Sequence, residues 1–360
     1  MQFTISTNVL KDMVSKAVKG ASCDSQIPLT TLMGIELDNN EFRLITTDAS
    51  NYLYIRNTEI TGDPFKVSVP VTVFSKLIAR MTSDSVAISV EENYLLIKGN
   101  GSYKIEFPID DDGSVVVFPD PLSTIIFDPN DTKEISLSTI QTILKSLKPA
   151  LAVTMEDPCY TGYYIGNSVL ATDTCQIACM DCSENLFGVP VLISPETMNL
   201  FTVMTDDKIT VDVLDNKIVF GSSNCTIYGT LMECIDDYAV DEITSLVETK
   251  FPAVCRLSKD ILLQLLDRLM LFIGKYDNNC IDLSFIKNGL HISSKSLSGI
   301  EVIPYLNSVE HVDFSCGINI NMFISQVKAC AGDVIELYYG LDNAIKIVDD
   351  NVRHVIAIVN

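Results

Sequence analysis

Apolar and polar residues follow one compound pattern that returns through the whole chain of 360 residues. In its clearest copy, an alternating segment at 66–70 leads into residues 71–82, where apolar side chains recur every three or four positions. Similar copies begin near 190 and near 311, and Pro70, Ile193 and Gly317 occupy matching places 123 and 124 residues apart. Because a period of two predicts a strand and a period of 3.6 a helix, the chain contains a threefold structural repeat.

Each third of the chain also opens with a strand and a helix of its own, so two helices are expected per third. The six predicted helices span residues 7–20, 71–82, 136–149, 194–204, 258–275 and 318–331. Short alternating runs joined by Asn, Asp and Gly turns separate them and predict strands. The order strand, helix, three strands, repeated six times, predicts an α+β fold with antiparallel sheets on one side and helices on the other.

The repeat also predicts three domains of about 120 residues, a typical size for an independent folding unit. The first ends in an acidic, proline-bearing stretch from Asp110 to Pro129, and the second ends in a linker from Asp236 to Pro252. The predicted domains are residues 1–121, 122–246 and 247–360.

Composition constrains the setting of the protein more than its function. The formal net charge is −22, from 25 Lys and Arg against 47 Asp and Glu, and hydrophobic residues make up 47% of the chain. No signal peptide or membrane span is expected, because the chain opens with a strand and its most apolar helix, 261–273, is interrupted by Asp267 and Arg268. Eleven cysteines, an odd number spread mostly through strands, predict a reducing cytoplasm.

The charge is unevenly distributed between the helices and the rest of the chain. The predicted helices sum to +7, whereas all other residues sum to −29. Lysine is a good helix former, so these residues could simply occupy solvated helix faces. If six equivalent helices face one direction, however, their lysines form a positive lining that holds phosphates without reading bases, while the acidic remainder repels DNA elsewhere.

With this repeat and charge distribution, the chain resembles the bacterial DNA polymerase III β subunit, the sliding clamp. The resemblance covers the whole length, the division into three and the order of elements. Its local echoes are Met1-Gln-Phe-Thr4, Leu44-Ile-Thr-Thr-Asp48 and Leu170-Ala-Thr-Asp173, and the two Asp residues are 125 positions apart, in step with the repeat. The third copy reads Ile292-Ser-Ser-Lys295 and lacks the acidic residue.

The resemblance implies a head-to-tail homodimer that closes into a ring of six domains with twelve helices around duplex DNA. Such a ring would be a non-catalytic processivity factor without a cofactor, and would hold a DNA polymerase and a clamp loader through short peptide motifs. Weak, sequence-independent contacts would let it slide. The candidate DNA-binding residues, chosen from helix position and charge, are Lys16, Lys19, Lys76, Arg80, Lys145, Lys148, Lys259, Arg268 and Lys328.

The family's peptide pocket lies between the second and third domains. By resemblance it maps to Tyr160, Thr172, Thr174, Cys175, Gln176, Ile177, Tyr238, Val240, Ala344, Val355 and Ala357. The family's usual Gly-His-Arg is replaced here by Thr174-Cys175-Gln176, and its Met-Pro-Met-Arg-Leu ending by Ala357-Ile-Val-Asn360. A pocket of altered specificity is expected; the alternative is that these are ordinary strand and core residues. The departures also suggest a clamp encoded by a phage or mobile element, acting in the cytoplasm of the bacterium or the infected host.

Ring closure requires one sheet edge from the first domain to join one from the third. Tyr103, Ile105 and Phe107 alternate on a strand of the first domain, and Leu271, Phe272 and Ile273 end a helix in the third. Both sets are candidates for the dimer interface. The alternative for both is an internal core position.

Enzymatic function finds little support in the sequence. There is no P-loop, His-Glu-x-x-His or Gly-x-Ser-x-Gly motif. Cys179-Met-Asp-Cys182 is a weak metal motif, because residues three apart on a strand point to opposite faces, so no metal is predicted. The rival hypothesis is an acidic interaction protein or DNA-mimicking inhibitor of the same fold that does not encircle DNA. A monomeric or trimeric ring is a further alternative to the dimer.

Overall fold

The computed structural model describes residues 2–359 except 39, 126–131, 275–277 and 296–297. Packing divides the chain into two compact units. The first comprises Met1–Ser138 with Glu196–Leu231, and the second Thr139–Pro195 with Met232–Asn360. The middle third of the sequence contributes strands to both units, so this packing does not test the predicted division into three domains.

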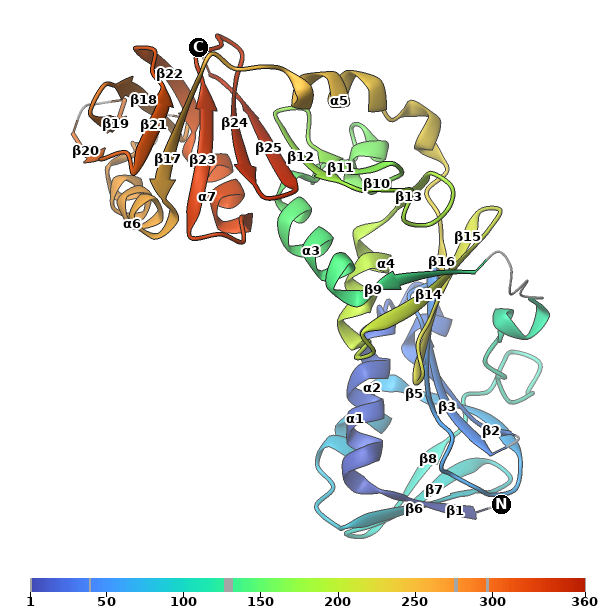
Figure 1. Cartoon of the computed structure of the whole chain (residues 1–360). Helices are drawn as coiled ribbons and strands as arrows, with labels where there is room; N and C mark the ends of the chain where they lie inside the picture. The colour runs from blue at the N-terminus through green and yellow to red at the C-terminus, as the bar shows by residue number, and fades with distance from the viewer. Residues whose placement is uncertain (1, 39, 126–131, 275–277, 296–297, 360) are drawn as a thin grey trace. The chain divides into compact units, whose positions relative to one another are not determined.

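The first unit contains twelve strands and three helices within its described residues (Figure 1). Its helices are α1 (Thr7–Ala17), α2 (Val71–Ala79) and α4 (Pro195–Asn199), the first and last continuing as the 3-10 turns η1 (Val18–Gly20) and η6 (Leu200–Val203). Its strands are β1 (Gln2–Ser6), β2 (Leu32–Asp38), β3 (Glu41–Thr47), β4 (Asn51–Asn57), β5 (Phe65–Pro70), β6 (Ser85–Val90), β7 (Tyr94–Lys98), β8 (Ser102–Glu106), β9 (Lys133–Ser136), β14 (Lys208–Leu214), β15 (Lys217–Gly221) and β16 (Cys225–Thr230).

The second unit carries the remaining elements. Its helices are α3 (Leu137–Leu147), which continues as η4 (Lys148–Ala150), α5 (Val240–Glu248), α6 (Lys259–Leu269), which continues as η8 (Met270–Phe272), and α7 (Ile320–Ala329). Its strands are β10 (Tyr163–Ile165), β11 (Ser168–Thr172), β12 (Gln176–Asp181), β13 (Val191–Ile193), β17 (Ala253–Ser258), β18 (Cys280–Ile286), β19 (Gly289–Ser294), β20 (Ile300–Ile303), β21 (Asn307–Glu310), β22 (Phe314–Asn319), β23 (Val334–Tyr339), β24 (Ala344–Asp349) and β25 (Val352–Ala357). The predicted order, strand, helix, three strands, is confirmed in all six copies, with β21 added.

Each unit contains one four-stranded sheet and one larger sheet, all antiparallel. The first unit has the orders β1-β6-β7-β8 and β5-β2-β3-β4-β16-β15-β14-β9. The second has β20-β19-β18-β22 and β13-β10-β11-β12-β25-β24-β23-β17-β21. Each larger sheet therefore joins two groups of four strands through the last strand of each group, β4 with β16 and β12 with β25, and the second sheet carries β21 as a ninth strand beside β17.

The Thr-Asp pairs that echo through the sequence form matching turns beside these joints. In the first unit the Asp48 carboxylate accepts the backbone N–H of Asn51 at 2.7 Å, and the Thr47 hydroxyl donates to the Asn51 carbonyl at 2.6 Å. In the second unit Asp173 accepts the N–H of Gln176 at 2.9 Å, and Thr172 donates to the Gln176 carbonyl at 2.8 Å. The repeated motif is thus a turn that leads the chain into the joining strand.

A buried polar side chain after each turn reaches a helix from the neighbouring group. Asn51 on β4 accepts the Thr197 hydroxyl of α4 at 2.6 Å, and Gln176 on β12 accepts the Gln326 amide of α7 at 2.7 Å. All four residues are buried. Since breaking such a contact leaves a buried polar group unpaired, at a cost of about 1–3 kcal/mol, each contact favours one register of the joint.

The helices pack through apolar stripes at three- and four-residue spacing. On α1 the buried stripe contains Leu10, Met13, Val14 and Ala17. The last helix, α7, begins where the Asn319 side chain accepts the N–H groups of residues 321 and 322, which are otherwise unpaired in the first turn. These stripes place the helices against the sheets, with α1 beside α2 in the first unit and α6 beside α7 in the second.

Helix α5 corrects the prediction of a linker from Asp236 to Pro252. It packs on β25 and β12 by Ile243 and Val247. Its C-terminal end is held by Lys346 on β24, whose buried ammonium donates to the carbonyls of Val247 at 3.1 Å and Thr249 at 2.8 Å. The sequence of residues 236–252 indicated a linker because only two apolar side chains of α5 are buried. Two such residues make a short and weak helical pattern.

His354 on β25 is fully buried, and both of its ring nitrogens lack a hydrogen-bond partner in the described part of the chain. Burial lowers its pKa to about 4, although Asp349 opposes the shift. The unfolded chain binds a proton at this histidine near pH 6.5, and the folded chain only near pH 4. The free energy of unfolding therefore decreases as the pH falls through this window.

We therefore predict that His354→Leu flattens the pH dependence of stability. Across the window from about 6.5 to 4 the wild type should lose roughly 3 kcal/mol more than the variant, because one pKa unit corresponds to about 1.4 kcal/mol. Urea unfolding between pH 7 and pH 4.5 measures the difference. His311→Gln is the control, since His311 is part exposed and both its ring nitrogens have partners, Tyr339 and Asp313. Equal slopes for wild type and His354→Leu would contradict the assignment.

A second prediction concerns the attachment of α5. Lys346→Met should lower the hydrogen-exchange protection of α5 amides by about tenfold, because the helix loses two charge-assisted hydrogen bonds at the end where its dipole favours a cation. Mass spectrometry of peptides covering 238–250 measures this loss. Lys217→Met is the matched control, since Lys217 also donates one hydrogen bond, to Thr230, but belongs to β15. Unchanged protection of α5 in Lys346→Met would show that apolar packing alone holds the helix.

Candidate nucleic-acid interface and partner pocket

The candidate DNA-binding residues of the first unit lie on a layer formed by α2, α1 with η1, and η6. Lys19, Lys76 and Arg80 are exposed. Lys16 forms an ion pair with Asp12 at 2.7 Å, and the Lys19 ammonium lies 3.4 Å from the hydroxyl of Thr202 on η6. The first unit therefore brings its four candidates onto neighbouring helices.

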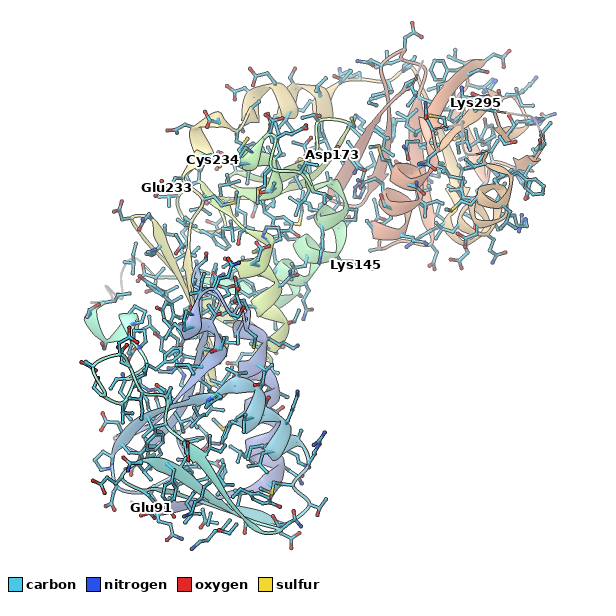
Figure 2. The ribbon with its side chains drawn as sticks, turned by 180° about the vertical axis from the view of Figure 1, so that it is seen from behind. Glu91, Lys145, Asp173, Glu233, Cys234 and Lys295 are labelled. Atoms are coloured by element: carbon cyan, nitrogen blue, oxygen red, sulfur yellow. The ribbon has the colours of Figure 1, made fainter. Side chains whose placement is uncertain are left out.

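The second unit has an equivalent layer of α3 with η4, α7 and α6, in which η4 contacts α7 and α7 contacts α6. Lys145 and Lys148 on the first member and Lys328 on α7 are exposed, and Figure 2 shows Lys145 on α3. Arg268 on α6 is exposed as well. Lys275, counted with the helices above, lies outside the described residues.

Two other candidates of the second unit are engaged by neighbouring groups. Lys259 donates to the carbonyls of Lys328 and Cys330 and so holds the C-terminal end of α7. Arg268 pairs with Glu301, with Nε 2.7 Å from a carboxylate oxygen, and this hydrogen bond raises the pKa of Arg268 and lowers that of Glu301. Both residues carry structural contacts that a phosphate would have to replace.

The basic residues of the helices share a position as well as a charge. Five helices, α1, α2, α3, α6 and α7, carry a Lys or Arg in their last turn. A cation there is stabilised by the negative end of the helix dipole. The solvated-face alternative and phosphate binding are therefore compatible, because the same placement stabilises the helix and leaves the charge at the surface.

The predicted partner pocket corresponds to an apolar cluster where β12 meets β25. Tyr238 lies at its centre, with the ring of Tyr160 edge-on at 5.2 Å and that of Tyr164 stacked at 5.4 Å. Ile177, Val355, Val240 and Ala344 belong to the same cluster. Burial raises the pKa of Tyr238 and of Tyr160, so both hydroxyls stay neutral in the physiological range. The structure thus brings together residues from β10, β12, β24, β25 and α5 with Tyr160 of the 3-10 turn Pro158–Thr161 and Tyr238, which follows the 3-10 turn Cys234–Asp237.

Some predicted pocket residues lie at the edge of this cluster or outside it. Thr174 and Cys175 are exposed in the turn after Asp173, and the Ala357 N–H donates to the Cys175 carbonyl at 2.9 Å. Thr172 is buried and its hydroxyl closes the turn. Gln176 points to the opposite face, toward Gln326 of α7. Strand alternation explains this last position, since Gln176 and Ile177 must face opposite sides.

Sequence reasoning missed Tyr164 and the α5 residues Ile243 and Val247 in this cluster. Tyr164 lies in the short strand β10, and nothing in its spacing distinguishes it. The α5 residues are four positions apart, which is a signal for a helical face, but they fall in the segment interpreted as a linker.

The predicted dimer residues fall into buried and exposed groups. Ile105 and Phe107 are buried, which fits the core alternative, whereas Tyr103 on the edge strand β8 is exposed. Leu271 and Phe272 are exposed, at 82% and 48%, and Ile273 is packed partly against the core. The sequence did not indicate that the edge strand β20 also exposes Ile300 and Val302.

The two cysteines of the Cys-x-x-Cys motif differ in environment. Cys179 is buried, with its pKa raised to about 12 by burial, and the Cys182 thiol, half-buried, lies 3.8 Å from the carbonyl of Met180. A thiol that stays protonated is a poor metal ligand. Among the described residues, no group of three or more His, Cys, Asp or Glu is arranged to hold a metal ion. None of the described helices has the length and apolar character needed to cross a membrane.

Comparison with known proteins connects these features to one family. Residues 1–112 match the family model for the N-terminal domain of the DNA polymerase III beta subunit. A beta sliding clamp of Staphylococcus epidermidis is 21% identical over 364 residues, covering 94% of this chain and 93% of the relative.

Solved structures with the same fold extend over the whole chain. The beta subunit from the DNA polymerase of Streptococcus pyogenes has a TM-score of 0.88 at 15% identity and covers 100% of both chains. The DNA polymerase sliding clamp from Bacillus subtilis has a TM-score of 0.86 at 17% identity, covering 100% of this chain and 99% of that one. The N-terminal domain match, the curated relative and the shared fold together make this chain similar to DNA polymerase III beta subunits.

Proposed function

We propose that this chain is a DNA sliding clamp, a non-catalytic processivity factor that encircles duplex DNA and tethers a replicative polymerase. The observation that carries the proposal is the clamp fold over the full length, with similarity to beta sliding clamps at both the sequence and the structural level. A clamp needs no reactive site, only a closed ring and a surface that tolerates DNA of any sequence.

The charge distribution supports the DNA-binding part of the proposal. The predicted helices sum to +7 in a chain whose net charge is −22. Lys19, Lys76, Lys145 and Lys328 are exposed on the two helix layers. Mobile side chains of this kind neutralise phosphates without reading bases, which permits sliding.

The sheet topology supports head-to-tail association of two copies. Within the chain, each larger sheet forms where the last strands of two four-stranded groups pair. The two remaining groups end in β8 and β20, each with one pairing partner in the described part of the chain. Pairing of β8 of one copy with β20 of another would repeat the internal joints, and two such joints close a C2 dimer. The division into domains at 1–121, 122–246 and 247–360 belongs to this proposal.

The apolar cluster around Tyr238 supports a partner pocket. It lies on the face of the joint opposite the Gln176 and Gln326 contact with α7. Polymerase and clamp loader would bind there through short peptides with apolar anchors. The exposed Thr174 and Cys175 at its rim are the residues at which specificity would differ from that of relatives. The setting would be the cytoplasm of a bacterium, or of an infected host if the chain is phage-encoded.

The first test is retention on DNA of defined topology. Copies dissociated by dilution and reassembled with nicked circular plasmid should stay bound through gel filtration and be released when the plasmid is linearised. Lys145→Glu with Lys148→Glu should shorten retention and reduce the salt slope of binding by roughly two, since two phosphate contacts are lost.

The control for this test changes the same charge elsewhere. Lys98→Glu with Lys208→Glu alters two exposed lysines on β7 and β14, outside the helix layers, and should leave retention unchanged. Equal release from circular and linear DNA would reject the clamp and favour the rival function, an acidic clamp-fold protein that does not encircle DNA.

The second test concerns self-association. Leu271→Asp should shift the solution mass from that of two chains toward that of one, because a charge at this exposed position would be buried beside the β20 edge. Analytical ultracentrifugation measures the mass. Val153→Asp, at a residue that is 96% exposed outside the proposed interface, is the matched control. A wild type that sediments as one chain or as three would contradict the dimer.

A further inference from the structure

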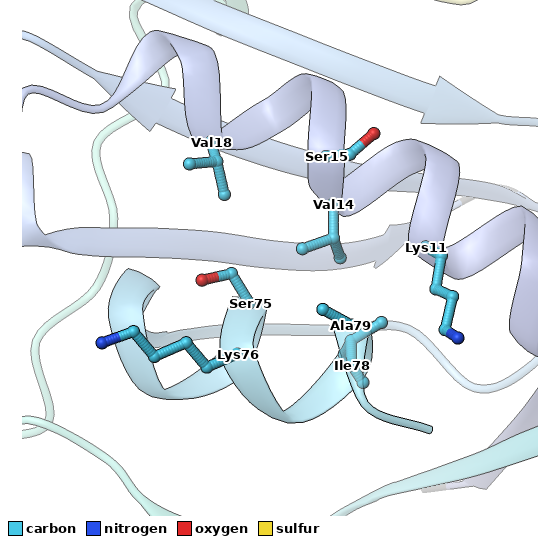
Figure 3. Close-up of a pocket in the computed structure, with 8 residues that line it drawn as sticks. All are labelled: Lys11, Val14, Ser15, Val18, Ser75, Lys76, Ile78 and Ala79. Carbon is cyan, nitrogen blue, oxygen red and sulfur yellow. The ribbon is translucent and has the colours of Figure 1, made fainter. Parts of the chain in front are cut away.

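A groove of about 420 Å³ runs between α1 and α2 in the first unit. Lys11, Val14, Ser15 and Val18 line it from the first helix and η1, and Ser75, Lys76, Ile78 and Ala79 from the second. Figure 3 shows the two lysines at opposite ends, with Val14, Ile78 and Ala79 between them. The groove lies within one unit, and both helices belong to the layer that carries the candidate DNA-binding residues.

The floor of the groove is apolar and its ends are cationic. Val14 and Ile78 form the buried part of the floor, while Val18 and Ala79 are partly or fully exposed. Among the described residues, no acidic side chain lines it. In the described chain neither Lys11 nor Lys76 forms an ion pair, whereas Lys16, which follows the lining residue Ser15, is paired with Asp12. The groove therefore has two positive charges without acidic partners, one at each end of a single apolar patch.

Duplex DNA complements only part of this surface. Its phosphates could approach Lys11 and Lys76, but a phosphodiester backbone presents no apolar group to fill the floor. A ligand that satisfies both features carries apolar side chains between two carboxylates. From Lys11 to Val18 the first helix rises about 10 Å, which matches roughly three residues of extended peptide.

We propose that the α1–α2 groove binds an acidic peptide segment of a partner protein, with one or two apolar side chains on the floor and a carboxylate at each end. The ammonium groups of Lys11 and Lys76 pair with these carboxylates. The site is distinct from the apolar cluster around Tyr238, which belongs to the second unit.

The position of the groove has a regulatory consequence that depends on the proposed function. If the helix layer faces DNA inside a ring, the same lysines cannot serve an acidic segment while they face phosphates. The partner then binds a clamp free of DNA and is displaced by DNA, which is competition through one shared surface rather than through a conformational change.

The test uses the full chain with labelled Val, Ile and Leu methyl groups and a blocked peptide of sequence Glu-Phe-Leu-Glu. Saturable NMR shifts are expected at Val14, Val18 and Ile78, with no such shifts from the blocked peptide Lys-Phe-Leu-Lys. Ala79→Phe should abolish these shifts by filling the floor. Lys11→Glu with Lys76→Glu should weaken the acidic peptide by about tenfold and make the lysine peptide the better ligand.

The control variant is Lys98→Glu with Lys208→Glu, which changes the net charge equally outside the groove and should leave the shifts intact. The proposal is overturned if no groove methyl responds at millimolar peptide, if Ala79→Phe leaves the shifts unchanged, or if a short DNA duplex gives the same shifts and Ala79→Phe weakens both ligands alike. Failure of plasmid retention with intact peptide binding would remove the clamp function and keep the groove site.

Discussion

The structure depends on the antiparallel pairing of sheet edges. A group of four strands ends in unpaired N–H and C=O groups, and such an edge has to be covered, blunted or paired. Here β4 pairs with β16 over five residues and β12 with β25 over five, so that each larger sheet extends across two strand groups. The joints set the direction in which successive helix and strand groups follow one another, and hence where their helices lie.

Buried polar contacts make each joint selective. A one-residue slip would move every side chain of the joining strand to the other face. It would also separate Asn51 from Thr197, or Gln176 from Gln326, in an apolar interior where an unpaired amide is costly. Apolar packing supplies most of the stability of the sheets, whereas these two contacts define the register.

The fold was predictable from sequence because its signals repeat. Six copies of strand, helix and three strands reinforce one another, and Asp48 and Asp173 mark equivalent turns. Helix α5 was missed because only Ile243 and Val247 of it are buried, and because its contact with the Lys346 ammonium on β24 joins residues about 100 positions apart. The side of the sheet to which Gln176 points was also not predictable, because it depends on where the preceding turn places the first residue of β12.

The candidate site was predictable only in its broad composition. Charge counting identified the basic helices, but it could not separate Lys145, which is exposed, from Lys259, whose ammonium holds the end of α7. It also could not show that Ile105 is buried while Tyr103, two positions away, is exposed on an edge strand. Exposure and pairing partners are set by tertiary contacts, which a single sequence does not contain.

The third copy of the turn departs from the other two, and the departure fits the role proposed for its strand. Before β20, Lys295 stands where Asp48 and Asp173 stand in the other copies, and its ammonium pairs with Asp282 of β18 at 2.7 Å. The carboxylate that fixes the strand at the two internal joints is therefore absent. An internal joint forms once and stays closed, since the chain holds both edges together at a high effective concentration. In the ring proposed above, the β20 edge would form the joint between copies, and that joint would lack the carboxylate that orders the turn at the two internal joints.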